Sequence, residues 1–259
     1  MALTDLPAAT ARVPLDRLRK TAMLAGGLYL VTYASSIPAR FFFLDPVLSD
    51  SGYIVGPGAD SRVLTGGLLD MVTALAGAAT AVVLFRVVKR QSETLALGFV
   101  ASRLLEAAVI SIGVVSLLAV VTLRQDLAGT TGAEETSLVP VGASLVAVNE
   151  WTFLFGPNVL AAVNALLLGT LMYRSGLVPR AIPLMGLIGA PLLLASVLGI
   201  VFGTHDLDAG LHLIAALPIG LWELSLGVYL VVKGFRPSPI TARAVPPSQL
   251  DPETLPAWR

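Results

Sequence analysis

Six long apolar stretches constrain the fold of this 259-residue chain more than any other feature of its sequence. A helix needs about 20 predominantly apolar residues to cross roughly 30 Å of hydrocarbon. The stretches cover residues 21–44, 63–88, 94–123, 150–173, 181–202 and 211–232. Residues do not alternate between apolar and polar as they do in the strands of a membrane barrel. The sequence therefore predicts an all-α, polytopic membrane bundle of six transmembrane helices.

The composition supports this class and excludes several others. Hydrophobic residues make up 55% of the chain and charged residues 13%, whereas soluble domains carry about 25% charged residues. Seventeen basic and seventeen acidic residues cancel, so no net field attracts nucleic acid. The absence of cysteine excludes disulfides, cysteine-bound metals and thiol catalysis. The lipid bilayer is the expected partner, and no nucleic acid is expected.

Basic residues indicate the orientation of the helices, because they concentrate in cytoplasmic loops. With six spans both termini share one side of the membrane, and thirteen of the seventeen basic residues lie there. These are Arg12, Arg17, Arg19, Lys20, Arg86, Lys89, Arg90, Arg174, Arg180, Lys233, Arg236, Arg243 and Arg259. Arg40 and the acidic loops fall on the opposite side. We therefore expect both termini in the cytoplasm.

The chain divides into three parts by composition. Residues 1–20 are polar and basic and form a cytoplasmic N-terminal segment, and no cleavage site follows the first apolar stretch. Residues 21–235 form the six-span membrane domain. Residues 236–259 contain six prolines and no apolar run, which predicts a disordered cytoplasmic tail.

The region between the third and fifth spans allows two interpretations. Residues 138–173 are too many for one membrane-crossing helix, and Gly156-Pro157 interrupts them. Two short spans would give seven helices, but a seventh span would move a basic cluster to the outside. We therefore expect residues 137–149 to lie as a helix on the outer surface. Pro157 would then kink or start the fourth span.

Several motifs resemble one family of bacterial membrane proteins. They are Gly27-Leu28-Tyr29-Leu30 in the first span, Asp70 in the second, Arg103 to Ala107 in the third, Tyr173 to Arg180 after the fourth, and Leu230 to Gly234 at the end of the sixth. Over roughly residues 15–235 the chain resembles the integral-membrane family called domain of unknown function 4386. The resemblance implies a multi-pass protein of the bacterial cytoplasmic membrane, and it assigns no activity to any residue.

Four ionisable residues lie well inside the predicted spans: Asp70, Arg103, Glu106 and Glu223. Each costs about 2.5–3.5 kcal/mol or more at the bilayer centre, so each should face the bundle interior and have a partner. At about 1.5 Å per residue, all four fall in one slab of the outer-to-middle membrane. We therefore expect spans two, three and six to be mutual neighbours, with Arg103 bridging the carboxylates.

These four residues have two interpretations. Three carboxylates and one guanidinium sum to −2, so carboxylates are protonated or a proton, metal ion or cationic solute binds there. In the alternative, the charges are structural and Arg103 fixes the packing of three spans. The sequence leaves both open.

Other polar residues give weaker signals. His205, Asp208 and His212 lie at the outer mouth of the sixth span and could share a metal, but Asp208 is more simply explained as a helix cap. No metal site and no cofactor is therefore assigned. Asn158 and Asn164 are expected to form hydrogen bonds between helices.

Three classes of function remain. The sequence contains no HExxH, GxSxG or Walker A motif, which favours a protein without enzymatic activity. The first hypothesis is a small transporter or permease-like protein of unknown substrate. The alternative is a non-catalytic membrane subunit or regulatory partner, and a membrane-embedded enzyme has the least support. Small residues on the second and fifth spans would also suit a homo-oligomer or a partner membrane protein.

The orientation can be tested with reporter fusions. Fusions at Arg90, Arg180 and Lys233 should report the cytoplasm, because basic loops stay inside. Fusions at Asp50 and Asp206 should report the outside. An external signal at Arg180 would contradict six spans and favour seven.

Overall fold

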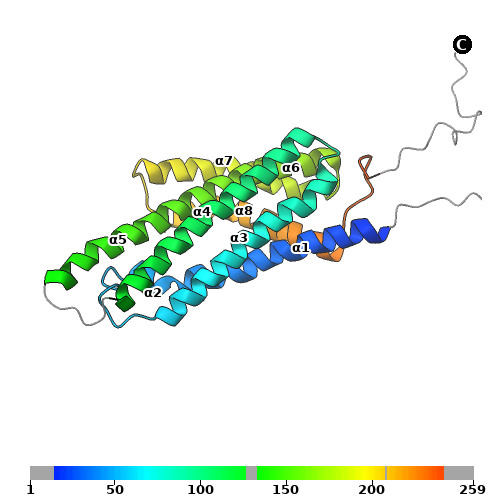
Figure 1. Ribbon diagram of the computed structural model, residues 1–259. Coiled ribbons are helices and arrows are strands. Elements are labelled where there is room, and N and C mark those ends of the chain that lie inside the picture. Colours follow the sequence, from blue (N-terminus) through cyan, green and yellow to red (C-terminus); the bar gives the residue numbers. More distant parts are fainter. Residues whose placement is uncertain (1–14, 127–132, 208, 242–259) are drawn as a thin grey trace, which may run out of the picture.

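The computed structural model describes residues 15–126, 133–207 and 209–241, and all regular elements in these ranges are helices (Figure 1). The elements are α1 (Leu15–Pro38), the π-helical segment η1 (Ala39–Phe43), α2 (Asp45–Ser49), α3 (Asp60–Val88), α4 (Glu93–Asp126), α5 (Ala133–Phe153), the π-helical segment η2 (Leu154–Leu160), α6 (Ala161–Ser175), α7 (Ala181–Val201) and α8 (Gly210–Val232).

Six helical runs in the described ranges are long and apolar enough to cross a membrane. They are Arg17–Phe43, Asp60–Val88, Glu93–Asp126, Ser137–Ser175, Ala181–Val201 and Gly210–Val232. The prediction of an all-α bundle with six spans is therefore confirmed. The cytoplasmic location of the termini stays a prediction.

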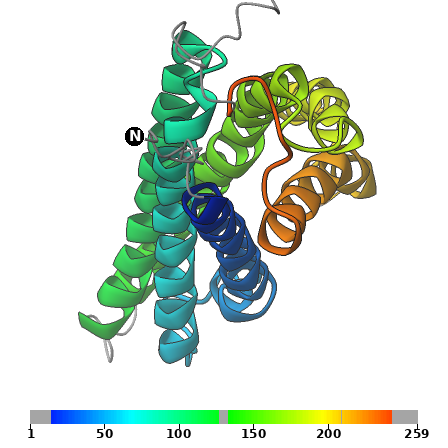
Figure 2. The ribbon, with the colours of Figure 1, turned by 90° about the vertical axis from the view of Figure 1, so that its right-hand side faces the viewer.

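The six spans form a closed ring. Each packs against the next in the order α1, α3, α4, α6, α7 and α8, and α8 packs back against α1 (Figure 2). The expectation that spans two, three and six are mutual neighbours is therefore wrong: α3 and α4 are neighbours, but α8 packs mainly against α1 and α7. Any contact between α4 and α8 must be made by long side chains that cross the interior of the ring.

The fourth span is longer than predicted. α5, η2 and α6 follow one another without a break, so the run from Ser137 to Ser175 is continuous. Leu138, Leu145 and Val146 of α5 pack against an apolar cluster that includes Leu117 and Val120 of α4. The expectation that residues 137–149 form a separate surface helix is wrong, because they continue into η2 and α6 and pack along α4 through partly buried apolar side chains.

Pro157 explains the π-helical turn in this span. Proline has no backbone N–H, so Pro157 leaves the carbonyl of Phe153 without its usual helical donor. The Nδ2 group of Asn158 donates to that carbonyl at 3.0 Å. The predicted interruption at Pro157 is thus a π-helical segment inside a continuous helix, and the side chain that follows the proline replaces the missing hydrogen bond.

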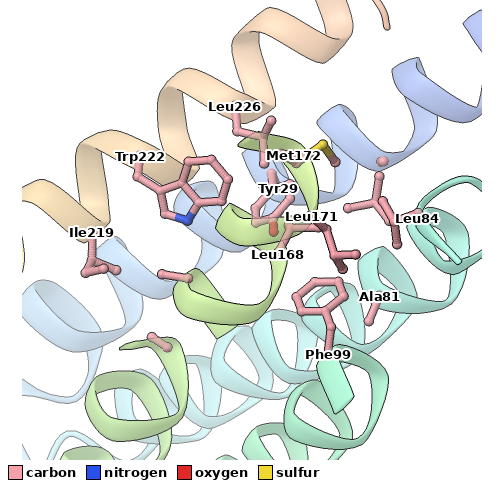
Figure 3. Close-up of a cluster of buried hydrophobic side chains, with 14 of the residues drawn as sticks. Tyr29, Ala81, Leu84, Phe99, Leu168, Leu171, Met172, Ile219, Trp222 and Leu226 are labelled. Atoms are coloured by element: carbon pink, nitrogen blue, oxygen red, sulfur yellow. The ribbon is translucent and has the colours of Figure 1, made fainter. Parts of the chain in front are cut away.

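An apolar core fills one half of the ring (Figure 3). It contains side chains from all six spans, and many of them lie at the end of the ring where α3 ends and α4 begins, while Leu193 and Val197 of α7 continue the core toward the other end. The labelled members are Tyr29, Ala81, Leu84, Phe99, Leu168, Leu171, Met172, Ile219, Trp222 and Leu226. The end where α3 ends and α4 begins is the predicted cytoplasmic half.

The opposite end of the ring is fixed by hydrogen bonds to Asp60 at the start of α3. Asp60 accepts from Arg124 Nε of α4 at 2.7 Å and from the hydroxyl of Tyr53 at 2.9 Å. Burial, together with the hydrogen bond to the Asp60 carboxylate, raises the pKa of Tyr53 to about 12. The loop between α2 and α3 is thereby attached to the ends of two spans.

Ordered structure extends slightly beyond residues 21–235 at both ends. Helix α1 begins at Leu15, within the predicted N-terminal segment. Beyond α8, the backbone N–H of Arg236 donates to Leu177 at 2.8 Å, and Ser238 Oγ donates to Ser175 at 2.5 Å. The first residues of the predicted tail therefore pack against the end of α6. Residues 1–14 and 242–259 lie outside the described residues.

Two adjacent glycines of α1 offer a test of helix packing. A Cβ atom on Gly26 would lie 2.6 Å from the backbone oxygen of Gly227 in α8, whereas one on Gly27 would meet nothing within 4 Å. We expect Gly26→Ala to lower the stability of the folded protein by about 1–3 kcal/mol through overpacking. Gly27→Ala should raise it by roughly 0.5–1 kcal/mol, because alanine favours the helix. Thermal unfolding in detergent measures both, and a Gly26→Ala variant as stable as Gly27→Ala would contradict the close contact of α1 and α8.

Candidate functional site

Arg103 of α4 lies at the centre of a buried charge triad with Glu106 and Glu223. Its Nη1 donates to Glu106 Oε2 at 3.0 Å, and its Nη2 forms an ion pair with Glu223 of α8. Nη2 also donates to the hydroxyl of Tyr29 of α1 at 3.4 Å. Arg103 and Glu106 share one helix face because they are three residues apart, and the long arginine side chain crosses the ring to reach α8. The structure thus brings together three of the four predicted residues.

Two further groups stabilise the triad. Asn164 of α6 donates from Nδ2 to Glu106 Oε2 at 2.7 Å, a hydrogen bond between helices of the kind predicted for this residue. The aromatic rings of Tyr29 and Phe99 lie 5.5 and 5.9 Å from the Arg103 guanidinium carbon, within the range of cation–π attraction. Arg103 and Glu106 are 5% and 7% exposed, so these contacts replace water as the environment of the charges.

Asp70, the fourth predicted residue, does not join the triad. It lines the same cavity as Arg103, but within the described part of the chain it forms no ion pair or hydrogen bond through its side chain. The opposite charge that acts on it most strongly is that of Arg40. The structure therefore separates the predicted cluster into the triad and an Arg40–Asp70 pair.

Arg40 is a site residue that the sequence analysis missed. It was assigned to the outer side, whereas the π-helical segment η1 extends the first span to Phe43 and directs Arg40 into the interior. Its guanidinium carbon lies 4.3 Å from the centre of the Phe153 ring, and its Nη1 donates to Asn149 Oδ1 at 3.4 Å. A signal was available, because Arg40 lies inside the first apolar stretch.

The charge balance of the site changes accordingly. The sequence analysis paired three carboxylates with one guanidinium, for a sum of −2. Counting Arg40, the cavity lining has two guanidinium groups and three carboxylates, for a formal sum of −1. One bound proton or one monovalent cation is enough to neutralise the site.

A cavity of about 340 Å³, the inner cavity, connects these charges. All six spans contribute to its walls, and Asp70, Arg103, Glu106 and Glu223 all line it. A second cavity of about 810 Å³, the outer chamber, is lined among others by Asp45, Glu150 and Asp206. Both cavities share Arg40, Phe41, Phe153, Asn158 and Ala216. The inner cavity thus adjoins a larger chamber at the end of the ring opposite the apolar core.

The two histidines take part in a hydrogen-bond network beside the outer chamber. Ser196 Oγ lies 3.0 Å from His205 Nε2 and 3.0 Å from His212 Nδ1, and His212 Nε2 lies 3.1 Å from Asn158 Oδ1. Asn158 thus also makes the predicted hydrogen bond between helices. Asp208, the third member of the metal alternative, lies outside the described residues. Among the residues described, no three His, Asp or Glu side chains are placed to hold a metal ion.

The fold and the site define an integral, multi-pass helical membrane protein with ionised groups inside its bundle. A family model described as "Domain of unknown function (DUF4386)" matches residues 24–234, and the chain belongs to this family. The family predicted from the sequence motifs is therefore confirmed. Searches among curated proteins and among solved structures found no match.

The triad can be tested by comparing the loss of its acids with the loss of its base. Arginine cannot discharge itself by losing a proton, so the double variant Glu106→Gln, Glu223→Gln leaves a buried cation without carboxylate partners. Breaking a buried pair in this way costs about 3–5 kcal/mol. We expect the double variant to lower the folded yield in detergent more than Arg103→Ala does. In Arg103→Ala the two carboxylates that remain can lose their charge by protonation. Asp70→Asn is the control with an unbroken triad, and equal yields for the double variant and Arg103→Ala would contradict the bridging role of Arg103.

Proposed function

We propose that the protein is a small transporter of the bacterial cytoplasmic membrane, and that the charge triad is its binding site for a proton or a small cation. The observation that carries this proposal is the inner cavity, which reaches the triad and has charged walls that sum to −1. A purely structural cluster would be enclosed and fully paired, because an open, charged cavity inside a membrane is costly. A cavity of this kind is the usual environment of substrate and ion pathways.

The arrangement of the cavities also fits transport. Closely packed apolar side chains such as Leu84, Leu171 and Leu230 fill the ring at one end, while the outer chamber extends from the inner cavity toward the other. Secondary transporters hold their substrate near the middle of the membrane and open to one side at a time. This structure corresponds to a form that is closed at the predicted cytoplasmic side.

Glu223 is the best candidate for the group that takes up the proton. Glu106 accepts hydrogen bonds from both Arg103 and Asn164. Among the described residues Glu223 forms an ion pair with Arg103 and with no other basic side chain, and its own side chain is 15% exposed, against 9% for Glu106. A proton added to Glu223 therefore disturbs fewer contacts and leaves the Arg103–Glu106 pair intact.

Infrared spectroscopy of the protein in lipid vesicles tests this site. Exposed carboxyl groups also protonate as the pH falls, but a carboxyl group in the poorly hydrated cavity should give a separate C=O band at higher frequency. That band should be missing in Glu223→Gln. The exposed Glu93 at the start of α4 supplies the matched control, because Glu93→Gln makes the same chemical change outside the cavity. A band that persists in Glu223→Gln would exclude Glu223 as the proton site.

Transport itself is tested in vesicles that contain a pH-sensitive dye. Under an imposed membrane potential we expect proton entry above that of protein-free vesicles. We expect it to fall by about tenfold or more in Glu223→Gln, equivalent to at least about 1.4 kcal/mol, and to be unchanged in Glu93→Gln. Rates equal to those of protein-free vesicles, with no protonation band, would favour the alternative of a non-catalytic membrane subunit.

A further inference from the structure

We propose that the inner cavity binds a small zwitterion, with the carboxylate of the ligand on Arg40 and its ammonium group on Asp70. This inference rests on the proposed transport function and names its substrate class. It depends on residues outside the triad: Arg40 of η1 and Asp70 of α3, which line the same cavity from two different elements.

The first observation is that these two opposite charges do not touch. No nitrogen of Arg40 lies within 4.0 Å of the Asp70 carboxylate in the structure, although each residue lies within range of the charge of the other. Ionised groups inside a membrane are costly unless they are paired. Two facing charges that stay apart beside a cavity therefore leave room for a ligand that carries both complementary charges.

The second observation is the unused bonding capacity of both groups. A guanidinium has five N–H donors, but among the described residues Arg40 makes one hydrogen bond, at 3.4 Å, to Asn149 Oδ1 and otherwise stacks on Phe153. Asp70 has no side-chain partner among the described residues. The triad differs, because Arg103 already has two carboxylates.

The chemical class of the ligand follows from the charges of Arg40 and Asp70. Arginine binds carboxylates through two parallel hydrogen bonds, and a carboxylate such as Asp70 pairs with an ammonium group. A simple cation would leave Arg40 unpaired, and a simple anion would leave Asp70 unpaired. A molecule with one carboxylate and one ammonium group satisfies both and adds no net charge.

The geometry of the cavities indicates the size of the ligand and its orientation. The inner cavity of about 340 Å³ lies at the lower end of the range for small-molecule pockets. Arg40 lines both the outer chamber and the inner cavity, whereas Asp70 lines the inner cavity alone. A zwitterion that enters through the outer chamber therefore reaches Arg40 first, and its ammonium group points inward. Because the pair Arg40–Asp70 is neutral, the charge of −1 on the triad stays available for a proton.

The test uses the purified protein in lipid nanodiscs and three matched sets of probes. These are the standard amino acids with uncharged side chains, their amides, which are cations, and their N-acetyl derivatives, which are anions. Binding is measured as the ligand-induced rise in unfolding temperature and by titration calorimetry. We expect at least one zwitterion to bind about tenfold or more tightly than its own amide and its own N-acetyl derivative, which corresponds to about 1.4 kcal/mol.

Variants of the two residues should change this selectivity in opposite directions. Arg40→Gln should weaken zwitterion binding until the amide binds equally well. Asp70→Asn should weaken zwitterion binding until the N-acetyl derivative binds equally well. The controls are Arg86→Gln and Asp126→Asn, which make the same changes at exposed positions of α3 and α4. If Arg40→Gln does not fold, Arg40→Lys keeps the charge but loses the two-pronged geometry, and it should still weaken binding of the carboxylate.

Two outcomes would overturn the inference, and both are distinct from failure of the transport proposal. Amides that bind as tightly as zwitterions, with no effect of Arg40→Gln, would show a site for cations alone and would leave the transport proposal standing. No binding by any member of the three sets would also overturn it. The transport proposal is then decided separately by the protonation of Glu223, which does not depend on the zwitterion.

Discussion

The guanidinium of Arg103 is the charge around which the ring of helices is organised. Arginine stays charged in proteins, and at this depth its charge must be stabilised by protein groups. The partners come from around the ring: Tyr29 from α1, Glu106 from α4 itself, and Glu223 from α8. Because α4 and α8 are not packed neighbours, this ion pair joins opposite sides of the ring across its interior. The Asn164 side chain adds α6 to the same network through Glu106.

The interior of the ring has a closely packed apolar part and an open part that contains the cavities. The triad is therefore accessible from one side. Aromatic and aliphatic side chains such as Trp222, Phe99 and Leu168 fill one half. The triad lies at the edge of this core, so its charges meet closely packed apolar groups on one side and the inner cavity on the other. Electrostatic interactions are stronger where water is excluded, so the core makes the triad sensitive to any ion or ligand that enters from the open side.

The sequence predicts those parts of the structure that depend on the bilayer alone. Length and hydropathy predict six spans, and the cost of burying charge predicts that Arg103 pairs with at least one of Asp70, Glu106 and Glu223. In the structure its partners are Glu106 and Glu223. The order of the helices around the ring could not be predicted from the charged residues. A long side chain such as Arg103 reaches across the ring, so two helices can share an ion pair without packing against each other. Arg40 was missed since its direction depends on a π-helical segment, and hydropathy does not distinguish π from α geometry. The long α5 was missed because its apolar residues, such as Leu145, fit a helix on the membrane surface as well as an extension of the fourth span.

The structural and functional interpretations of the buried charges apply to different residues. Arg103 and Glu106 have several mutual and neighbouring hydrogen bonds, so their pairing stabilises the fold whether or not a ligand is present. Glu223, Asp70 and Arg40 line the inner cavity with bonding capacity unused, and ionised groups are expensive to keep in that condition inside a membrane. For Asp70 and Arg40, which form no ion pair with each other, stability alone would favour apolar residues of similar volume. The cost of unpaired charge therefore favours a functional role for Glu223, Asp70 and Arg40. The hydrogen bonds of Arg103 and Glu106 join α4 to α1, α6 and α8 and so hold the ring together.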